Sequence, residues 1–521
     1  MLKFSDFTCA YQTAPNRDVG ECRVVIPEEL WPASWKNIYK PGDRVCVLVK
    51  KSLYGRYRAG FDYDAFAHGI YRKLGWRPIW DVDTSLYVWD GQENRNAVET
   101  GASMEASRVQ EANLVADQAH AGTRKVPDSA LRYIDDNLLA CDADQIDLRF
   151  TELSQVFKQP EIKDLNHEKF LGTTHHFYKI DDNQVGIIWE QEDLLTQSVQ
   201  AFQEEMREKG LGTLRNRNTP APAEDNFSPQ TREQEQQGAL KRAPYPTGEK
   251  KGVFADTCLT HLGAWAWCES HCRPEITIIV NYLQQRTTVW CDVCDKLLVW
   301  LGGYLQATRD QGLHAVVDRR DFDERKLKLV LQTDASHAGC VDTRKSTCGY
   351  AIYLRGSYGT EALISWGTKK MTTVSLSSVE SELFGLTFGS KFSIYQKLLV
   401  DALQGDTPCV LPQYGMYDVE SENVDEGDGI SELAEMDAEA AIKAVRKSES
   451  SKLKHTRRTT GISLGWLHAK WINRKKALLN HRKGTLLSAD GLTKRLGRIA
   501  IGRVKEQFGV RIKEDTVTPT N

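Results

Sequence analysis

The sequence predicts a multidomain protein of the α/β and α+β classes, in which mixed sheets pack with helices. The chain has 521 residues, more than one hydrophobic core usually organises, so we expect roughly two to four domains. From Met1 to about residue 90, short strand-like runs alternate with turns marked by Gly and Pro. From Lys326 onward, three strand patterns are followed by a helix pattern. Strands and helices therefore both contribute to the fold.

The clearest strand pattern runs from Lys326 to Asp334. Leu327, Leu329 and Leu331 fall on one face, whereas the lysines fall on the other, which is typical of a half-buried strand. A helix begins near Ser378, with apolar residues on one side. The two strands expected between them span 349–354 and 362–366.

A second pattern surrounds Tyr133-Ile134-Asp135-Asp136, which lies between short apolar runs and predicts a β-hairpin. Side chains alternate faces along a strand, so adjacent aspartates reach the same ion only at a bend. The pair is therefore a candidate divalent-cation site. An ordinary turn is the alternative, because Asp and Asn side chains hydrogen-bond their own backbone.

Charge is unevenly distributed, although the net charge is only −3. Residues 401–440 hold twelve acids and no Lys or Arg, whereas residues 441–515 hold twenty Lys or Arg and five acids, a difference of +15. A basic region of this kind is typical of phosphate binding, and a solvated surface is the alternative.

Other segments have no core-forming pattern. Residues 91–128 are polar and Ala-rich and indicate a surface insertion, and 215–251 indicates a linker. The start lacks a secretory signal, and no run approaches the ~20 apolar residues of a membrane span. Because the twelve cysteines are scattered, we expect an intracellular chain, cytoplasmic or nuclear, without membrane association.

A series of short motifs then occurs in an order that resembles the reverse transcriptase and ribonuclease H region of copia-type (Ty1/copia) retrotransposon polyproteins. No single motif is specific, but the shared order covers about residues 4 to 497. The motifs are Asp6-Phe7-Thr8-Cys9-Ala10-Tyr11, Lys51-Ser52-Leu53-Tyr54-Gly55, Tyr133-Ile134-Asp135-Asp136, Phe170-Leu171-Gly172, Arg273-Pro274-Glu275-Ile276, Arg344-Lys345-Ser346-Thr347-Cys348-Gly349-Tyr350, Leu376-Ser377-Ser378 and Ala489-Asp490-Gly491-Leu492-Thr493-Lys494.

The resemblance implies a domain order. We expect a partial reverse transcriptase palm and thumb, a linker, a helical connection region, a ribonuclease H-like mixed sheet with helices and a short tail. An acidic insertion is expected within the ribonuclease domain. The expected limits are 1–214, 215–251, 252–322, 323–505 and 506–521, with the acidic insertion at about 404–435.

The resemblance also implies a polymerase site. Nucleotidyl transfer uses two divalent ions, and Mg²⁺ favours carboxylate oxygens. Asp6, Asp135 and Asp136 would supply them, with Mn²⁺ as the alternative ion. Tyr11 would lie under the incoming deoxynucleoside triphosphate, with a core aromatic as the alternative, and Arg58 stands where the family has a nucleotide-contacting glutamine.

Two departures from the family pattern bear on polymerisation. Five residues precede Asp6, where the family has a fingers region whose basic residues hold the triphosphate, and Arg58 replaces the glutamine. We therefore expect this chain alone to extend a DNA primer on an RNA template poorly or not at all.

The ribonuclease site would also hold two Mg²⁺ ions, through four carboxylates. Asp334 ends the first strand of that domain. Glu380 and Glu382 lie about 200° apart on a helix, so both cannot face one ion. Ser377-Ser378-Val379-Glu380 fits a capping box, which leaves Glu382 as the ligand. The remaining ligands expected from the family pattern are Asp437, with Asp418 as its weaker rival, and Asp490.

The sequence thus predicts a retrotransposon-derived RNA-directed DNA polymerase with ribonuclease H activity on RNA–DNA hybrids. Its partners would be an RNA template, a DNA primer and the hybrid. The alternative is a non-catalytic remnant that binds nucleic acid without turnover.

Overall fold

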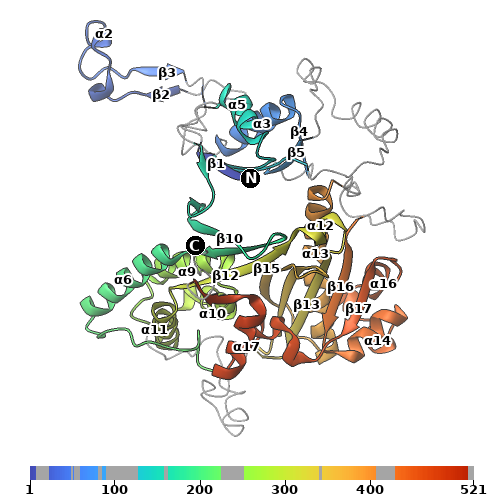
Figure 1. The fold of residues 1–521 in the computed structure, drawn as a ribbon. Helices are drawn as coiled ribbons and strands as arrows, with labels where there is room; N and C mark the ends of the chain where they lie inside the picture. The colour runs from blue at the N-terminus through green and yellow to red at the C-terminus, as the bar shows by residue number, and fades with distance from the viewer. Residues whose placement is uncertain are drawn as a thin grey trace. The chain divides into compact units, whose positions relative to one another are not determined.

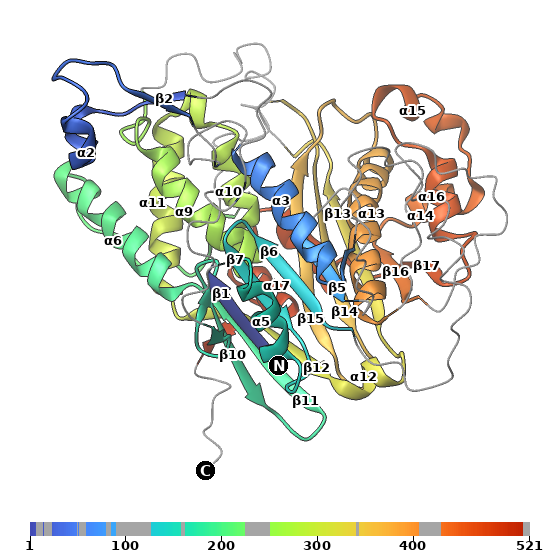
Figure 2. The same cartoon turned by 90° about the horizontal axis from the view of Figure 1, so that it is seen from above.

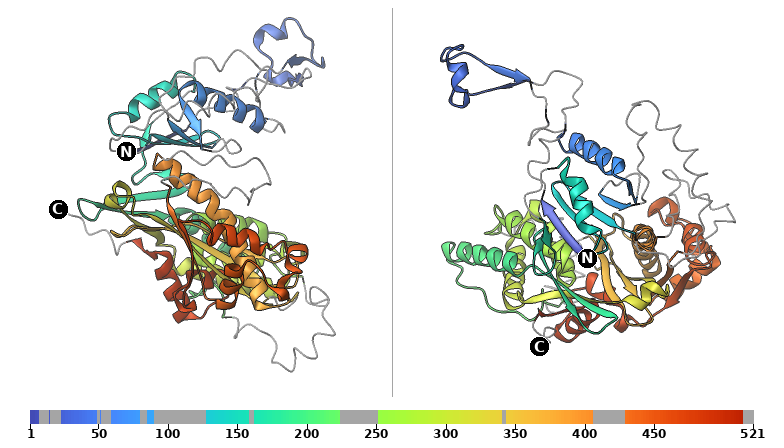
Figure 3. Two further views of the ribbon diagram at one scale, coloured as in Figure 1. Left: turned by 90° about the vertical axis from the view of Figure 1, so that its right-hand side faces the viewer. Right: turned by 45° about the horizontal axis from the view of Figure 1, so that its top comes forward.

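The computed structural model divides into two compact units (Figure 1, Figure 2 and Figure 3). The first comprises Met1–Leu165 with Ala402–Pro408, and the second comprises Asn166–Asp401 with Cys409–Asn521. Both sheets and helices are present, so the chain is a mixed α/β multidomain protein with several sheets. The structure describes residues 1–6, 14, 23–48, 51, 59–79, 85–89, 127–157, 162–223, 251–339, 343–405 and 429–513.

Several predicted features lie outside these residues. Tyr11, Arg58 and Asp418 are among them. The expected insertion at 91–128 also falls outside the described residues, except for its last two positions.

The first unit contains a six-stranded sheet with the strand order β4-β5-β6-β7-β1-β8. Helices α3 (Ala59–Lys73) and α5 (Ile146–Ser154) contribute Tyr63, Tyr71 and Phe150 to its hydrophobic core. A separate two-stranded hairpin, β2–β3, accompanies the short helices η1 and α2. The bounds are β1 Leu2–Asp6, β2 Arg23–Val25, η1 Glu28–Leu30, α2 Ala33–Lys36, β3 Cys46–Leu48, β4 Trp76–Pro78, β5 Leu86–Trp89, β6 Ser129–Tyr133, β7 Asp136–Ala140 and β8 Lys163–Asp164.

The second unit contains a ten-stranded sheet with the order β17-β16-β13-β14-β15-β12-β11-β10-β9, and β18 pairs with β12. Strands β13, β14 and β15 are antiparallel neighbours, whereas β16 and β17 run parallel to β13. The bounds are β9 Lys169–Phe170, β10 Thr173–Lys179, β11 Gln184–Glu190, β12 Gln311–Asp318, β13 Lys328–Ser336, β14 Thr347–Arg355, β15 Glu361–Lys370, β16 Ser431–Met436, β17 Ala477–His481 and β18 Val510–Ile512.

The predicted succession of three strands and a helix is confirmed by β13, β14, β15 and α13. Helix α13 (Ser378–Leu403) starts where the sequence places it, although β13 continues two residues beyond Asp334. Other helices of this unit are α12 Arg319–Asp323, α14 Glu439–Lys447, η5 Ser451–Leu453, α15 Thr456–Thr459, α16 Leu464–Trp471, η6 Gly484–Leu486, η7 Ser488–Leu492 and α17 Arg498–Phe508.

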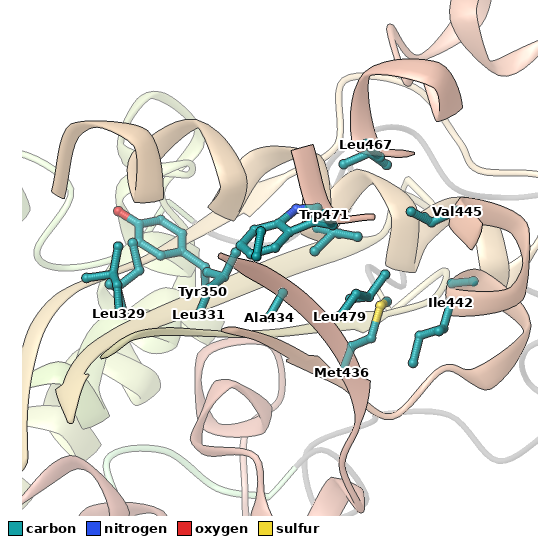
Figure 4. Close-up of a cluster of buried hydrophobic side chains, with 14 of the residues drawn as sticks. Leu329, Leu331, Tyr350, Ala434, Met436, Ile442, Val445, Leu467, Trp471 and Leu479 are labelled. Carbon is teal, nitrogen blue, oxygen red and sulfur yellow. The ribbon is translucent and has the colours of Figure 1, made fainter. Parts of the chain in front are cut away.

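One face of this sheet packs against α13, α14 and α16 (Figure 4). Leu329 and Leu331 of β13 and Ala434 of β16 lie in the same buried cluster as Trp471 of α16 and Val445 of α14. The expected apolar face of β13 is therefore confirmed.

The opposite face of β13 is also covered, so the prediction of a half-buried strand was wrong. Val330 packs with Val504 and Phe508 of α17. The polar side chain on this face, Gln332, is buried and donates to Glu435 Oε2 at 2.9 Å. A helix from the far end of the chain excludes water from this face, which local alternation does not reveal.

The expected acidic insertion at 404–435 is wrong at its C-terminal end. Residues 431–435 form most of β16 and pair with β13. Glu432 is buried and forms an ion pair with Lys470 at 2.9 Å, while Glu435 binds Arg482 at 2.8 Å. These acids are tolerated in a sheet because each has a cationic partner from a later element.

Between strands β11 and β12 in sequence lies a helical region with its own hydrophobic core. Leu195, Phe202, Trp265, Ile279 and Leu298 are buried together in it. The helical region expected at 252–322 contains α9, α10 and α11, but strand β12 also falls within these limits. The helices are α6 Glu192–Glu208, α9 Cys258–His271, η3 Pro274–Ile276, α10 Thr277–Gln284, η4 Thr287–Val289 and α11 Asp292–Ala307.

Helix α6 and strands β9–β11 were expected in a palm and thumb region ending at residue 214. They pack in the second unit, because the apolar face of α6 is buried against α9 and α11. The expected linker also begins differently. Residues 215–223 lie against α11, where Arg217 donates its backbone N–H to the carbonyl of Gly303 at 3.1 Å.

None of the described helices carries a stretch long and apolar enough to cross a lipid bilayer.

Candidate active sites

Three predicted acids meet in the second unit. Asp334 lies near the end of β13, Glu382 on the first turns of α13, and Asp437 directly after β16. Each offers a carboxylate oxygen, and these oxygens all lie within 4.8 Å of one another. Because β16 runs parallel beside β13, the C-terminal ends of both strands deliver an acid to the same edge of the sheet.

Burial and mutual repulsion perturb these acids. Asp334 and Glu382 are only 3% and 8% exposed. Burial, followed by the charges of Asp334 and Asp437, raises the pKa of Glu382 to about 9. Burial also raises the pKa of Asp334, against the opposing effect of Lys494. Such a cluster of carboxylates favours either bound protons or a cation.

The donor set fits a divalent metal. Among the described residues, Oε2 of Glu382 has no hydrogen-bond partner although it is buried. All three candidate ligands offer hard carboxylate oxygens, which Mg²⁺ and Mn²⁺ prefer. The buried acidic triad could therefore hold a metal ion.

The fourth predicted acid, Asp490, is linked to this cluster through a cation. Lys494 Nζ lies 2.7 Å from Asp490 Oδ1 and 3.3 Å from Asp334 Oδ2. Asp334, Asp490 and their hydrogen bonds raise the pKa of Lys494 despite its burial. The Thr493 hydroxyl also donates to Asp334 Oδ2. Asp490 thus lies beside Asp334 but is not one of the three close ligands.

Close packing places the segment that carries Asp490. Gly349 on β14 is the register partner of Asp334. A Cβ at Gly349 would lie 2.6 Å from Cβ of Leu492 in η7, so only glycine permits this approach. The glycine therefore helps to hold Thr493 and Lys494 against Asp334.

Glu380 has the capping role that the sequence predicts. Its Oε2 accepts from the backbone N–H of Leu376 at 2.7 Å, and its own N–H donates to Ser377 Oγ at 3.2 Å. The bond to Ser377 is one half of a capping box, while the Glu380 carboxylate binds the N–H one residue before the N-cap. Glu380 is therefore engaged at the start of α13, while Glu382 faces Asp334 and Asp437.

Sequence reasoning missed Thr493 and Lys494 as members of this site. Both belong to the motif at 489–494, but the sequence pattern gives them no role. The usable signal was the spacing of Asp490 and Lys494, which are four residues apart and carry opposite charges. Gln332 accepts hydrogen bonds from the hydroxyl and the backbone N–H of Ser488 and so helps to fix η7. The sequence did not indicate this role, because a glutamine in a strand usually faces solvent.

The Asp-Asp hairpin is present in the first unit. Strands β6 and β7 are joined by a loop of two residues, Ile134 and Asp135. Ile134 has φ of +55°, which is unfavourable for a β-branched residue. Asp6, at the end of β1, lies opposite Asp136 in the register of β1 and β7. The backbone therefore brings Asp6 beside the hairpin.

Buried polar contacts support this turn. The Asn137 side chain donates to the carbonyl of Asp135 at 3.0 Å and accepts from the Tyr71 hydroxyl at 2.5 Å. Tyr71 also stacks on Tyr87, with ring centroids 4.5 Å apart. Among the described side chains, three possible ligand atoms within 4.8 Å of one another are found around Asp334 and not at this hairpin.

No protein-family model matches the chain, but comparisons with known proteins find similar sequences and similar solved structures. Secreted RxLR effector protein 161 of Plasmopara viticola is 32% identical over 138 residues, which are 26% of this chain and 89% of that protein. This chain belongs to the same family as that protein. The uncharacterized mitochondrial protein AtMg00810 of Arabidopsis thaliana is 26% identical over 257 residues, covering 48% of this chain and 87% of that protein.

A structural similarity extends over more of the chain. The crystal structure of the prototype foamy virus protease-reverse transcriptase aligns with 97% of this chain and 67% of that chain, at 9% identity and a TM-score of 0.20. At this score the alignment supports no argument about fold or function.

Proposed function

We propose that the chain is a reverse transcriptase-like retroelement protein whose second unit is a magnesium-dependent ribonuclease acting on RNA–DNA hybrids. The observation that carries the proposal is the meeting of Asp334, Glu382 and Asp437 from three separate elements at one edge of the sheet. The resemblance to copia-type polyproteins supports the same assignment, because Asp437 and Asp490 are ligands expected from the family pattern.

The strand order supports the same assignment. Within the larger sheet, β15-β14-β13-β16-β17 place the first strand at the centre, with two antiparallel neighbours on one side and two parallel strands on the other. A helix follows the third strand, as the ribonuclease H resemblance implies. Fold similarity alone would not establish the chemistry, so the proposal depends on the acids.

Asp334, Glu382 and Asp437 would hold the metal, with Asp490 next to them. Bound Mg²⁺ would activate water and stabilise charge on the phosphate. The protein's own contribution is to hold three carboxylates in place before substrate arrives. Lys494 and Thr493 orient Asp334, since both contact its Oδ2. Because Asp334 and Glu382 are buried, little water screens the electrostatic attraction between their carboxylates and a cation.

For the first unit we propose the palm of an RNA-directed DNA polymerase. The register of Asp6 with Asp136, and the placement of Asp135 in the tight loop, support a metal site at this hairpin. Tyr11 and Arg58 would contact the deoxynucleoside triphosphate, and an RNA template with a DNA primer would be the substrate. Because Arg58 stands where the family has a nucleotide-contacting glutamine, primer extension is expected to be weak.

Cleavage of a hybrid with labelled RNA tests the ribonuclease proposal. With Mg²⁺, the chain should cut the RNA, and Asp334→Asn should reduce the rate by at least about a hundredfold, because even outer-shell changes at metal sites cost 10- to 100-fold. Asp323→Asn is the matched control, since it alters an exposed aspartate that pairs with Arg319. Its rate should equal that of the unmodified chain.

Two results would count against the proposal. Equal cleavage by Asp334→Asn and the unmodified chain would exclude Asp334 as a ligand. Binding of the hybrid without cleavage, at any Mg²⁺ concentration, would favour the non-catalytic nucleic-acid-binding remnant instead.

A further inference from the structure

A basic cavity lies in the second unit beside α11 and the start of α17. It has a volume of about 640 Å³. Three of its ten lining residues are cationic, namely Arg217, Lys296 and Arg498, and none is acidic. A surface with cations and no carboxylate attracts external anions, so it is a candidate for phosphate binding.

Two of the three cations of this cavity, Arg217 and Arg498, are available for a ligand. Within the described part of the chain, neither Arg217 nor Arg498 has a carboxylate within ion-pair distance, whereas Lys296 pairs with Asp292 at 2.8 Å. The guanidinium carbon of Arg217 lies 3.9 Å from the ring centroid of Trp300. A guanidinium stacked in this way keeps its N–H edge free for a phosphate, and its orientation is fixed in advance.

Trp300 is itself held in place. Its indole N–H donates to the carbonyl of Thr219 at 2.9 Å. The backbone N–H of Arg217 donates to the carbonyl of Gly303. The residues before Ala223 are thus fixed on α11 by one main-chain bond and one bond from an indole N–H. The cavity wall is a built surface, formed by two segments far apart in sequence and by the start of α17.

The cavity is also near the acid cluster along the chain. Lys494 contacts Asp334, and Arg498 lies four residues later. Four residues span at most about 14 Å between Cα atoms. Lys494 and Arg498 therefore lie close together along the chain, one contacting Asp334 and the other lining the cavity. Between them, Arg495 lies over the ring of Tyr282, at 5.4 Å from its centroid.

We propose that this cavity binds backbone phosphates of the hybrid substrate, near the phosphodiester bond that is cut. The inference rests on the proposed ribonuclease function and adds a substrate-binding surface to it. Arg217 and Arg498 grip the phosphates, and Trp300 orients Arg217. The contact reads no base sequence, since phosphates carry none.

Binding of a fluorescently labelled RNA–DNA hybrid, measured by anisotropy at several salt concentrations in a chelator, tests this inference without cleavage. The double variant Arg217→Gln/Arg498→Gln should bind several-fold more weakly and should lower the slope of log K against log salt by about 1 to 2, because each lost phosphate contact removes about 0.9. The control Lys179→Gln/Arg319→Gln loses the same charge at two exposed sites that pair with Asp182 and Asp323. It should keep the original slope.

A charge-preserving variant separates binding from folding. Arg217→Lys/Arg498→Lys should restore the slope of log K against log salt. Arg498→Gln alone alters an exposed position, so it should lower that slope by about 1 without changing the unfolding temperature. Equal slopes for the cavity variant and the control would overturn the inference. If the unmodified chain cleaves the hybrid while the cavity variant binds normally, only this inference fails. If the unmodified chain binds no hybrid, the proposed function fails with it.

Discussion

Glu382 is the residue on which the electrostatics of the acid cluster depend most. Its pKa of about 9 results mainly from burial and then from the charges of Asp334 and Asp437. Without a cation, the folded protein therefore keeps a proton on Glu382 at neutral pH. A divalent ion would replace that proton, so metal binding and proton release should be linked.

This linkage has a definite sign in unfolding experiments. In a chelator, the unfolded chain ionises Glu382 above about pH 4.5 while the folded protein does not until about pH 9, so the folded state loses stability as pH rises through this window. The free energy of unfolding should fall by up to about 1.4 kcal/mol per pH unit relative to Glu382→Gln. Urea denaturation at several pH values measures the difference. Parallel pH profiles for the two proteins would contradict the assignment.

At the scale of elements, helix α13 carries two glutamates, Glu380 and Glu382, that lie two residues apart and have different roles. Glu380 binds the backbone before the helix, whereas Glu382 joins Asp334. Glu380→Gln should leave hybrid cleavage almost unchanged, because glutamine also completes a capping box. Glu382→Gln should reduce cleavage by at least about a hundredfold. Steady-state cleavage rates of the two variants give the comparison, and an equal loss in both would show that the helix start, not the ligand, matters.

Elements with a regular pattern were predictable from the sequence. The alternation of Leu327, Leu329 and Leu331 predicted one buried face of β13, and the capping motif predicted the start of α13. The second buried face of β13 was not predictable, since Val504 and Phe508 come from residues more than 170 positions later. Strand β16 was missed because Glu432 and Glu435 suggest a solvated segment, and their partners Lys470 and Arg482 are remote in sequence.

The site residues divide in the same way. Asp334, Glu382 and Asp437 were expected as ligands of one ribonuclease site, and the structure brings them together. The bridging position of Lys494 between Asp334 and Asp490 depends on how η7 packs on Gly349, which no local pattern encodes.

At the scale of the molecule, the two proposed metal sites lie in different compact units. Their activities should therefore be separable by mutation. Asp135→Asn should leave hybrid cleavage unchanged, and Asp334→Asn should leave whatever primer extension the chain supports unchanged. Both assays on both variants check this. Loss of cleavage in Asp135→Asn would mean that the units do not act independently.

The central claim is that Asp334, Glu382 and Asp437 bind a divalent cation. Titration of the full chain with Mn²⁺, followed by electron paramagnetic resonance of the free ion, measures this binding directly, with Mg²⁺ as competitor. The account predicts that Asp334→Asn and Glu382→Gln each lose the Mn²⁺ bound by the acid cluster, while Asp323→Asn retains it. Identical Mn²⁺ binding by the unmodified chain and both ligand variants would contradict it.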